Sequence, residues 1–117
     1  MALYPDGGFA LTMGTPGGDS QTQSLLQISH NMMIFGMTPQ QAIEAPRFRS
    51  LRGVSVAIED RIQPEVLLEL ESLGHSLQVI PGWIATFGGA HMIFYERGTE
   101  VLTAAADSRR EVYSLLY

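Results

Sequence analysis

Cysteine and lysine are both missing from this chain of 117 residues. Without cysteine there is no disulfide bond, no thiol nucleophile and no zinc site built from thiolates. Without lysine there is no Schiff base and no Walker-type phosphate site, and all 7 basic residues are arginine. Neither absence indicates a compartment, so the localisation is left open between cytoplasmic and periplasmic or secreted.

Long apolar runs and an excess of positive charge are also missing. No apolar run approaches the roughly 20 residues of a membrane-spanning helix, and the first residues lack the basic start of a signal peptide. The 7 basic and 12 acidic residues give a formal net charge of -5, which provides no basic face for nucleic acid. We therefore expect no membrane span and no nucleic-acid partner.

Metal-ligand spacing is absent among the three histidines, His30, His75 and His91. They form no His-x-x-x-His or Glu-x-x-His pair, so we predict structural positions on helix surfaces, in turns or in the core. Glu69 and Glu71 predict a solvated helix face rather than a pair of catalytic carboxylates. The sequence thus predicts no metal and no other cofactor.

The composition that remains is that of a globular domain, with 45% hydrophobic and 16% charged residues. We interpret residues 1–117 as a single domain or a fragment of one. Strand and helix patterns alternate along it, which predicts an α+β fold. Strands are predicted over residues 8–13, 54–59, 76–80, 90–95 and 101–106, and helices from residue 20 to 35, from 39 to 45 and from 64 to 73.

Apolar spacing indicates which helix faces are buried. Leu25, Ile28 and Phe35 fall on one side of the first predicted helix, and Val66 and Leu73 fall on one side of the third. Residues 47–53 follow the second helix as a polar connection that carries several arginines.

A glycine-rich turn at residues 14–18 joins the first predicted strand to the first predicted helix. A Gly-Gly pair alone is more typical of a tight structural turn. Between a strand and a helix, however, the N–H groups of Gly17 and Gly18 can point into one concavity and stabilise an oxyanion. Asp19, which follows them, is interpreted either as the N-cap of the helix or as a substrate contact.

Arginines near two predicted strand ends have open roles. Arg47 either pairs with a carboxylate at a subunit junction or is a plain surface residue. Arg109 and Arg110 are placed to anchor the C-terminal tail through Asp107.

Five segments, in order along the chain, resemble the C-terminal part of the γ-glutamyltransferase family. The first is the Gly-Thr-Pro-Gly-Gly-Asp turn, and the third carries the Glu-Ala-Pro-Arg-Phe sequence. No single match is specific, but the ordered set spans nearly the whole chain. The segments are residues 14–19, 35–37, 42–48, 70–75 and 105–110.

This resemblance implies an N-terminal nucleophile hydrolase with an αββα sandwich. In that family a precursor cuts itself into two subunits, and the new N-terminal threonine of the small subunit attacks a γ-glutamyl amide to form an acyl-enzyme. Gly17 and Gly18 correspond to the oxyanion-hole residues. The nucleophile corresponds to no residue of this chain, which resembles the C-terminal portion of the small subunit.

The resemblance also implies partners and a substrate class. The remainder of the small subunit and the large subunit would be the partners, and a γ-glutamyl or related acyl amide would be the substrate. The isolated chain is predicted to be inactive and to oligomerise through exposed apolar surface. Many members have serine where Asp19 stands, and an anion there would disfavour a substrate carboxylate. The alternative is a non-catalytic α+β binding or assembly module that kept the scaffold.

Overall fold

The computed structural model describes residues 1–111, which form two β-sheets and three α-helices. Sheet A has the strand order β1-β2-β6-β7, and sheet B has the order β3-β4-β5. The mixed α+β class expected from the sequence is confirmed. The strands are β1 Ala2–Leu3, β2 Phe9–Gly14, β3 Phe48–Ser50, β4 Ser55–Glu59, β5 Ser76–Ile80, β6 His91–Glu96 and β7 Val101–Ala106; the helices are α1 Gln21–Met33, α2 Pro39–Glu44 and α3 Pro64–Ser72.

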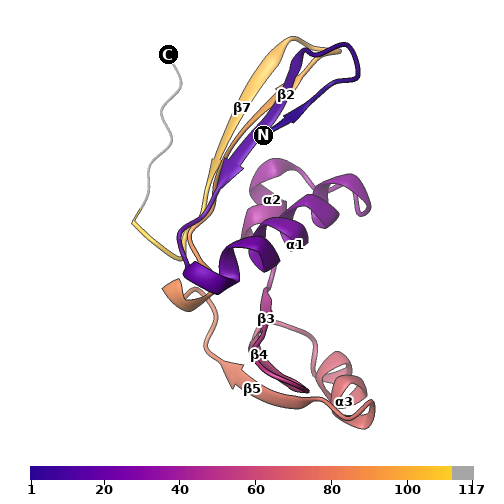
Figure 1. Cartoon of the computed structure of the whole chain (residues 1–117), viewed down its shortest axis with the longest axis vertical. Helices are drawn as coiled ribbons and strands as arrows, with labels where there is room; N and C mark the ends of the chain where they lie inside the picture. Colours follow the sequence, from indigo (N-terminus) through magenta and orange to yellow (C-terminus); the bar gives the residue numbers. More distant parts are fainter. Residues whose placement is uncertain (112–117) are drawn as a thin grey trace.

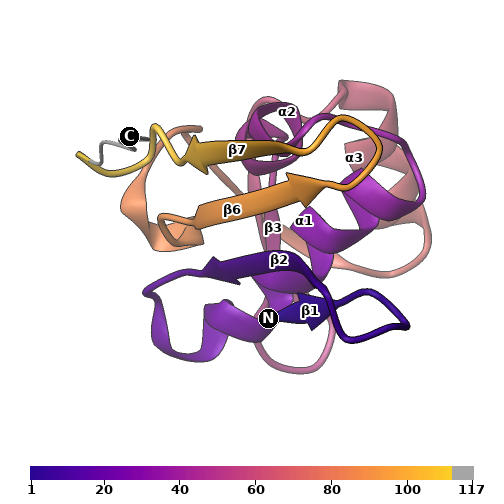
Figure 2. The same cartoon turned by 90° about the horizontal axis from the view of Figure 1, so that it is seen from above.

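The main core lies between sheet A and the two helices α1 and α2, which cover one face of the sheet (Figures 1 and 2). All the strands of this sheet pair antiparallel, and β6 and β7, both predicted as strands, form a hairpin. Ile28 of α1 and Ile43 of α2 pack in one cluster with Met92 and Ala105 from the hairpin, all at most 2% exposed. Strand alternation places the neighbouring Ile93 on the other face, where it is 40% exposed.

That other face of sheet A is open among the described residues. Figure 2 looks directly onto it, with the helices behind the strands. Ile93 and Leu102 from two different strands are both exposed on the molecule. No helix within residues 1–111 has both the length and the apolar character that a bilayer crossing requires.

Sheet B combines an antiparallel β3–β4 pair with a parallel β4–β5 pair. Helix α3 makes the connection that a parallel pair needs, and it begins at Pro64, where proline is favoured. The predicted helix is confirmed, but the predicted burial of Val66 and Leu73 is wrong, since they are 41% and 71% exposed. Phe35, beyond the end of α1, is likewise 68% exposed.

Two glutamine side chains of α1 hold the edge of sheet B. Gln27 accepts from the N–H of Phe48 at 3.0 Å and donates to the carbonyl of Phe48 at 2.9 Å. One helical turn earlier, Gln23 makes the same pair of bonds with Ser50, at 2.7 and 3.2 Å. Each glutamine amide thus bonds to β3 as one residue of a neighbouring strand would. The sequence predicts residues 47–53 only as a connection, whereas in the structure part of this segment is strand β3.

Candidate functional site

The turn between β2 and α1 carries two glycines in backbone conformations that other residues rarely adopt. The φ angles are 138° at Gly17 and 55° at Gly18. Gly17 is half-buried and Gly18 is exposed. Within residues 1–111, neither N–H group donates a hydrogen bond, so both are available to a ligand.

The turn is fixed from inside by Ser20. Both the N–H and the hydroxyl of Ser20 donate to the carbonyl oxygen of Gly17, at 3.1 and 2.8 Å. A Cβ atom added to Gly17 would collide with that hydroxyl oxygen. Glycine is therefore required at residue 17 for its conformation and for the space that Ser20 occupies.

A second loop, residues 87–90, supports the turn from the side. The hydroxyl oxygen of Thr15 accepts from the N–H of Gly89 at 2.9 Å and donates to the carbonyl of Pro16 at 3.0 Å. Ser24 of α1 donates to the carbonyl of Phe87 at 3.1 Å. The sequence analysis assigns no role to this loop, and no sequence pattern indicates its contact with Thr15.

Buried ion pairs hold this second loop. Arg47 and Asp107 are joined at 2.7 Å, and Asp107 also bonds Arg109 at 3.1 Å. Arg109 in turn pairs with Glu59 at 2.6 Å, and all four residues are at most 4% exposed. We call these four residues the ion network. The surface alternative for Arg47 is wrong, and its expected pairing with a carboxylate is confirmed, with the partner in the same chain. The pairing of Arg109 with Asp107 is also confirmed, while the tail beyond residue 111 lies outside the described residues.

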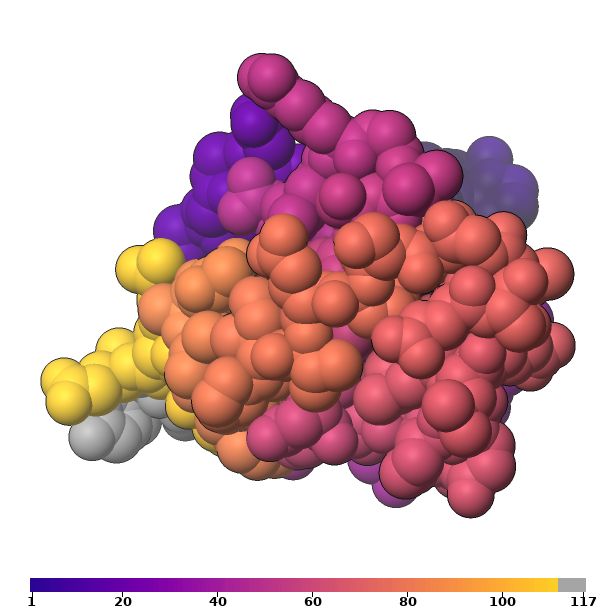
Figure 3. Space-filling view, turned by 90° about the horizontal axis from the view of Figure 1, so that it is seen from below, coloured from indigo at the N-terminus to yellow at the C-terminus, as the bar shows by residue number. Residues whose placement is uncertain are grey.

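The ion network bonds directly to backbone near the glycine turn. Arg47 donates to the carbonyl of Phe87 at 2.9 Å, and Asp107 accepts from the N–H of Ala90 at 3.0 Å. Arg109 donates to carbonyls at the end of α2, including that of Ile43 at 3.0 Å. In the space-filling view, the orange segment that contains this loop lies between the α3 region and the yellow C-terminal segment (Figure 3).

Glu59 is the central carboxylate of the ion network. Besides Arg109, it accepts hydrogen bonds from Arg61, whose guanidinium lies 3.8 Å from the centroid of the Trp83 ring. Burial alone would raise the pKa of Glu59, but the hydrogen bonds and charges of Arg109 and Arg61 outweigh it and lower the pKa. The carboxylate is therefore held ionised. The sequence did not single out this residue.

Asp19 does not act as the N-cap of α1. It lies within a 3₁₀ turn, Gly18–Ser20, and Ser20 occupies the N-cap position without a capping bond from its side chain. The N-cap interpretation of Asp19 is therefore wrong. Its side chain is exposed and lines a pocket that also contains Arg49 and Arg52.

His30 and His75 lie apart from this site, whereas His91 pairs with Gly14 at the start of the glycine turn. His30 is in the last turn of α1 and His91 opens β6, while His75 follows Gly74 at the end of α3, where its N–H donates to the carbonyl of Leu70 at 3.1 Å. Within residues 1–111, His, Asp and Glu side chains form no group able to hold a metal ion.

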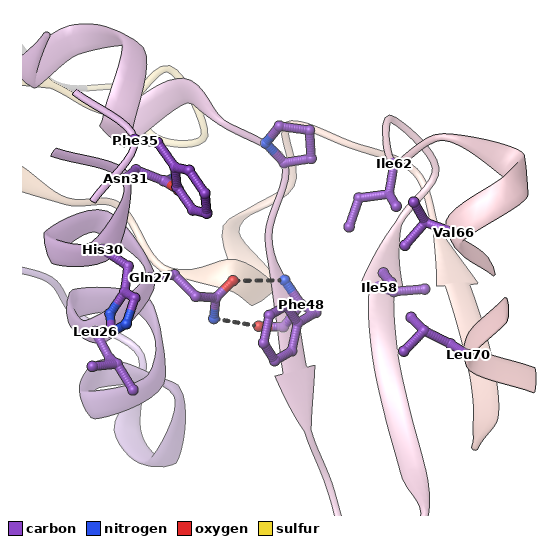
Figure 4. A pocket seen from close by; sticks show the side chains of 11 residues that line it. Leu26, Gln27, His30, Asn31, Phe35, Phe48, Ile58, Ile62, Val66 and Leu70 are labelled. Atoms are coloured by element: carbon purple, nitrogen blue, oxygen red, sulfur yellow. Dashed lines mark hydrogen bonds between the residues drawn. The ribbon is translucent and has the colours of Figure 1, made fainter. Parts of the chain in front are cut away.

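A larger cleft of about 550 Å³ separates α1 from α3. Figure 4 shows Leu26 and Phe35 on the α1 side of it, facing Ile62 and Leu70 on the α3 side, with Phe48 between them. Its lining is mostly apolar, and it offers no cluster of ionisable groups for chemistry. It has the character of a surface for packing rather than for catalysis.

Comparison with known proteins decides the family. The model of the gamma-glutamyltranspeptidase family matches residues 1–117, the whole chain. The chain belongs to the gamma-glutamyltranspeptidase family. The family identified from the motifs is thereby confirmed, and the glycine turn lies inside the matched region.

Relatives within the gamma-glutamyltranspeptidase family are much longer. The glutathione hydrolase proenzyme of Bacillus subtilis (strain 168) is 30% identical over 108 residues, which cover 92% of this chain and 18% of that protein. Glutathione hydrolase proenzyme 1 of Schizosaccharomyces pombe is 28% identical over 116 residues, again 18% of its length. The chain therefore spans less than a fifth of these curated relatives.

Solved structures show the same fold. The gamma-glutamyltranspeptidase from Pseudomonas nitroreducens complexed with L-DON superposes with a TM-score of 0.86 at 21% identity, covering 100% of this chain and 60% of that one. The cephalosporin acylase from Bacillus halodurans gives a TM-score of 0.78 at 31% identity, covering 83% of this chain and 18% of that one. The fold expected for an N-terminal nucleophile hydrolase is confirmed.

Proposed function

We propose that this chain is the C-terminal portion of an enzyme that cleaves γ-glutamyl or related acyl amides through a threonine acyl-enzyme. Its own contribution is the oxyanion hole. The observation that carries this proposal is the pair of N–H groups at Gly17 and Gly18, which have no hydrogen-bond partner within residues 1–111. They lie at the start of a helix, where the dipole also favours negative charge.

The chemistry of acyl transfer explains what two such donors do. When a nucleophile attacks an amide, the carbonyl oxygen gains negative charge in the tetrahedral intermediate. Donors that are already in place stabilise this charge without reorganising, and removing one donor typically slows the reaction by about 100- to 1000-fold. A rigid turn is therefore needed, and Ser20 and Thr15 supply contacts that hold it.

The attacking group belongs to residues outside this chain under the proposal. None of the threonines here is N-terminal, and an N-terminal threonine uses its own amine as the general base. We therefore assign the nucleophile to a preceding part of a longer enzyme, consistent with relatives named as proenzymes. The remainder of the small subunit and the large subunit are the proposed partners.

Exposed apolar surface supports the existence of such partners. The open face of sheet A carries Ile93 and Leu102, and the cleft of Figure 4 carries further apolar side chains. In the absence of its partners, we expect the chain to self-associate through this surface. The same surface also favours the second candidate, a non-catalytic assembly module, so turnover has to separate the two.

The test is hydrolysis of γ-glutamyl-p-nitroanilide and glutaryl-p-nitroanilide by the 117-residue chain and by a longer enzyme that includes the preceding residues. We expect release of nitroaniline from the γ-glutamyl compound by the longer enzyme alone. Turnover by the pure 117-residue chain would contradict the assignment of the nucleophile. Cleavage of only the glutaryl compound would overturn the γ-glutamyl specificity, and cleavage of neither compound would favour the assembly module.

A further inference from the structure

A polar pocket of about 380 Å³ opens directly beside the glycine turn. Asp19, the residue that follows Gly18, forms part of its wall. The other lining residues come from sheet B and the loop after β3, and they are Arg49, Leu51, Arg52, Ser55 and Gln78. The pocket therefore joins the start of α1 to one face of a sheet that is distant in sequence.

The register of sheet B places two of the lining residues on one face. Arg49 of β3 pairs with Ala57 of β4, and Ala57 pairs in turn with Gln78 of β5. Residues paired directly across strands share one face of a sheet. Arg49 and Gln78 therefore contribute to the wall of the pocket from the same face of the sheet.

Most arginines outside this pocket have a carboxylate partner. Those that pair in this way are Arg47, Arg61, Arg97 and Arg109.

By contrast, the side chains of Arg49, Arg52 and Asp19 take part in no ion pair or hydrogen bond within residues 1–111. The Nε atom of Arg49 is buried and has no hydrogen-bond partner. Arg49 is half-buried and Arg52 is exposed, so their guanidinium groups are the charged donors that the pocket offers to a ligand.

We propose that Arg49 and Arg52 bind a carboxylate group of the compound that reacts at the glycine turn. Two guanidinium groups and one carboxylate leave the pocket with a formal surplus of one positive charge. The planar fork of a guanidinium matches the two oxygens of a carboxylate, which makes this the preferred ligand class. Under this proposal, the surplus of positive charge outweighs the repulsion that Asp19 would exert on a substrate carboxylate, and the link to catalysis rests on the proposed function.

Binding can be measured without any turnover. The 117-residue chain is titrated with glutarate, a dicarboxylate, and with glutaramide, its neutral analogue, while backbone amide shifts are followed by NMR. We expect glutarate alone to shift amides near Asp19 and Arg49, and Arg52→Gln to weaken its binding about tenfold. Because Arg52 is exposed and makes no side-chain contact in residues 1–111, this variant should keep the fold.

Arg97→Gln is the matched control, since Arg97 is an exposed arginine that pairs with Asp6 at the far hairpin. It should bind glutarate like the unchanged chain. The proposal is overturned if glutarate and glutaramide bind equally, or if Arg52→Gln binds glutarate as the control does.

Kinetics in the longer enzyme identify which reactant carries the carboxylate. If it belongs to the acyl donor, Arg52→Gln raises the KM for γ-glutamyl-p-nitroanilide about tenfold; if it belongs to the acceptor, the KM for glycylglycine rises instead. Unchanged KM values for both would refute the link to catalysis. An enzyme inactive on every acyl amide would refute the proposed function but leave glutarate binding intact, so the two failures are distinguishable.

Discussion

Arg47 and Asp107 lie at a separation of 2.7 Å between a guanidinium nitrogen and a carboxylate oxygen, with both side chains excluded from solvent. Arg47 follows α2 and Asp107 follows β7, so this contact joins two segments that are far apart in the sequence. Each also bonds the loop that supports the glycine turn, through Phe87 and Ala90. Stability and site geometry are therefore linked through this pair.

Asp107→Asn should be strongly destabilising, because it leaves the buried charge of Arg47 without its counter-ion. Breaking a buried pair in this way costs about 3–5 kcal/mol in the free energy of unfolding. Urea denaturation followed by circular dichroism measures the change. Asp6→Asn removes the carboxylate of an exposed pair and should shift the midpoint little; equal shifts for the two variants would refute a special role for the buried pair.

Acid should weaken the fold through Glu59. Its pKa is lower in the folded chain than its ordinary value of 4.5, so the folded state binds the proton less tightly than the unfolded state. The resulting stability is fully present above pH 4.5 and is lost as the pH falls from there through the folded pKa.

Glu59→Gln should therefore be less stable than the unchanged chain at pH 7, and the difference should shrink steadily below pH 4.5. Urea midpoints at a series of pH values provide the measurement. Parallel curves for the two proteins down to pH 3 would contradict the assignment.

Thr15 is predicted to position the glycine turn through the N–H of Gly89. Thr15→Val keeps the shape of the side chain but leaves that N–H unpaired, at a cost of about 1–3 kcal/mol in stability. In the longer enzyme, kcat should fall while KM stays nearly constant, because the donors at residues 17 and 18 are displaced. Thr15→Ser retains the hydroxyl and should restore kcat; a serine variant as slow as the valine one would contradict this role.

Each of two backbone N–H groups of β3 should be protected from hydrogen exchange by a single glutamine side chain. Gln27→Met should speed hydrogen exchange at the N–H of Phe48 by at least about fivefold, since about 1 kcal/mol of protection is lost. Exchange at Ser50 should change little, because Gln23 still covers it. Gln23→Met should give the opposite pattern, and equal acceleration at both amides in each variant would show general loosening instead.

Local patterns in the sequence predicted most of the elements. Helix α2 begins at the predicted Pro39, after a capping box formed by Thr38 and Gln41, and β5 has the predicted bounds of Ser76 and Ile80. These features depend on neighbours in the chain, so a sequence contains them directly.

The features that sequence reasoning missed depend on residues far apart. Strand β3 pairs with β4 on one side, and Gln23 and Gln27 complete its hydrogen bonds on the other side from a distant element. The burial of Arg47 and Glu59 requires partners near the opposite end of the chain. Leu73 had the right spacing for a buried helix face, yet among the described residues little covers that side of α3.

Gly17→Ala in the longer enzyme tests the central claim most directly, with steady-state hydrolysis of γ-glutamyl-p-nitroanilide as the measurement. Alanine at a φ of 138°, against the hydroxyl of Ser20, displaces the turn. The account predicts that kcat falls about 100-fold or more at nearly constant KM, while Gly98→Ala, which has open space for a Cβ in the distant hairpin, leaves kcat unchanged. A folded Gly17→Ala enzyme with the kcat of the Gly98→Ala control would contradict the assignment of the oxyanion hole to this turn.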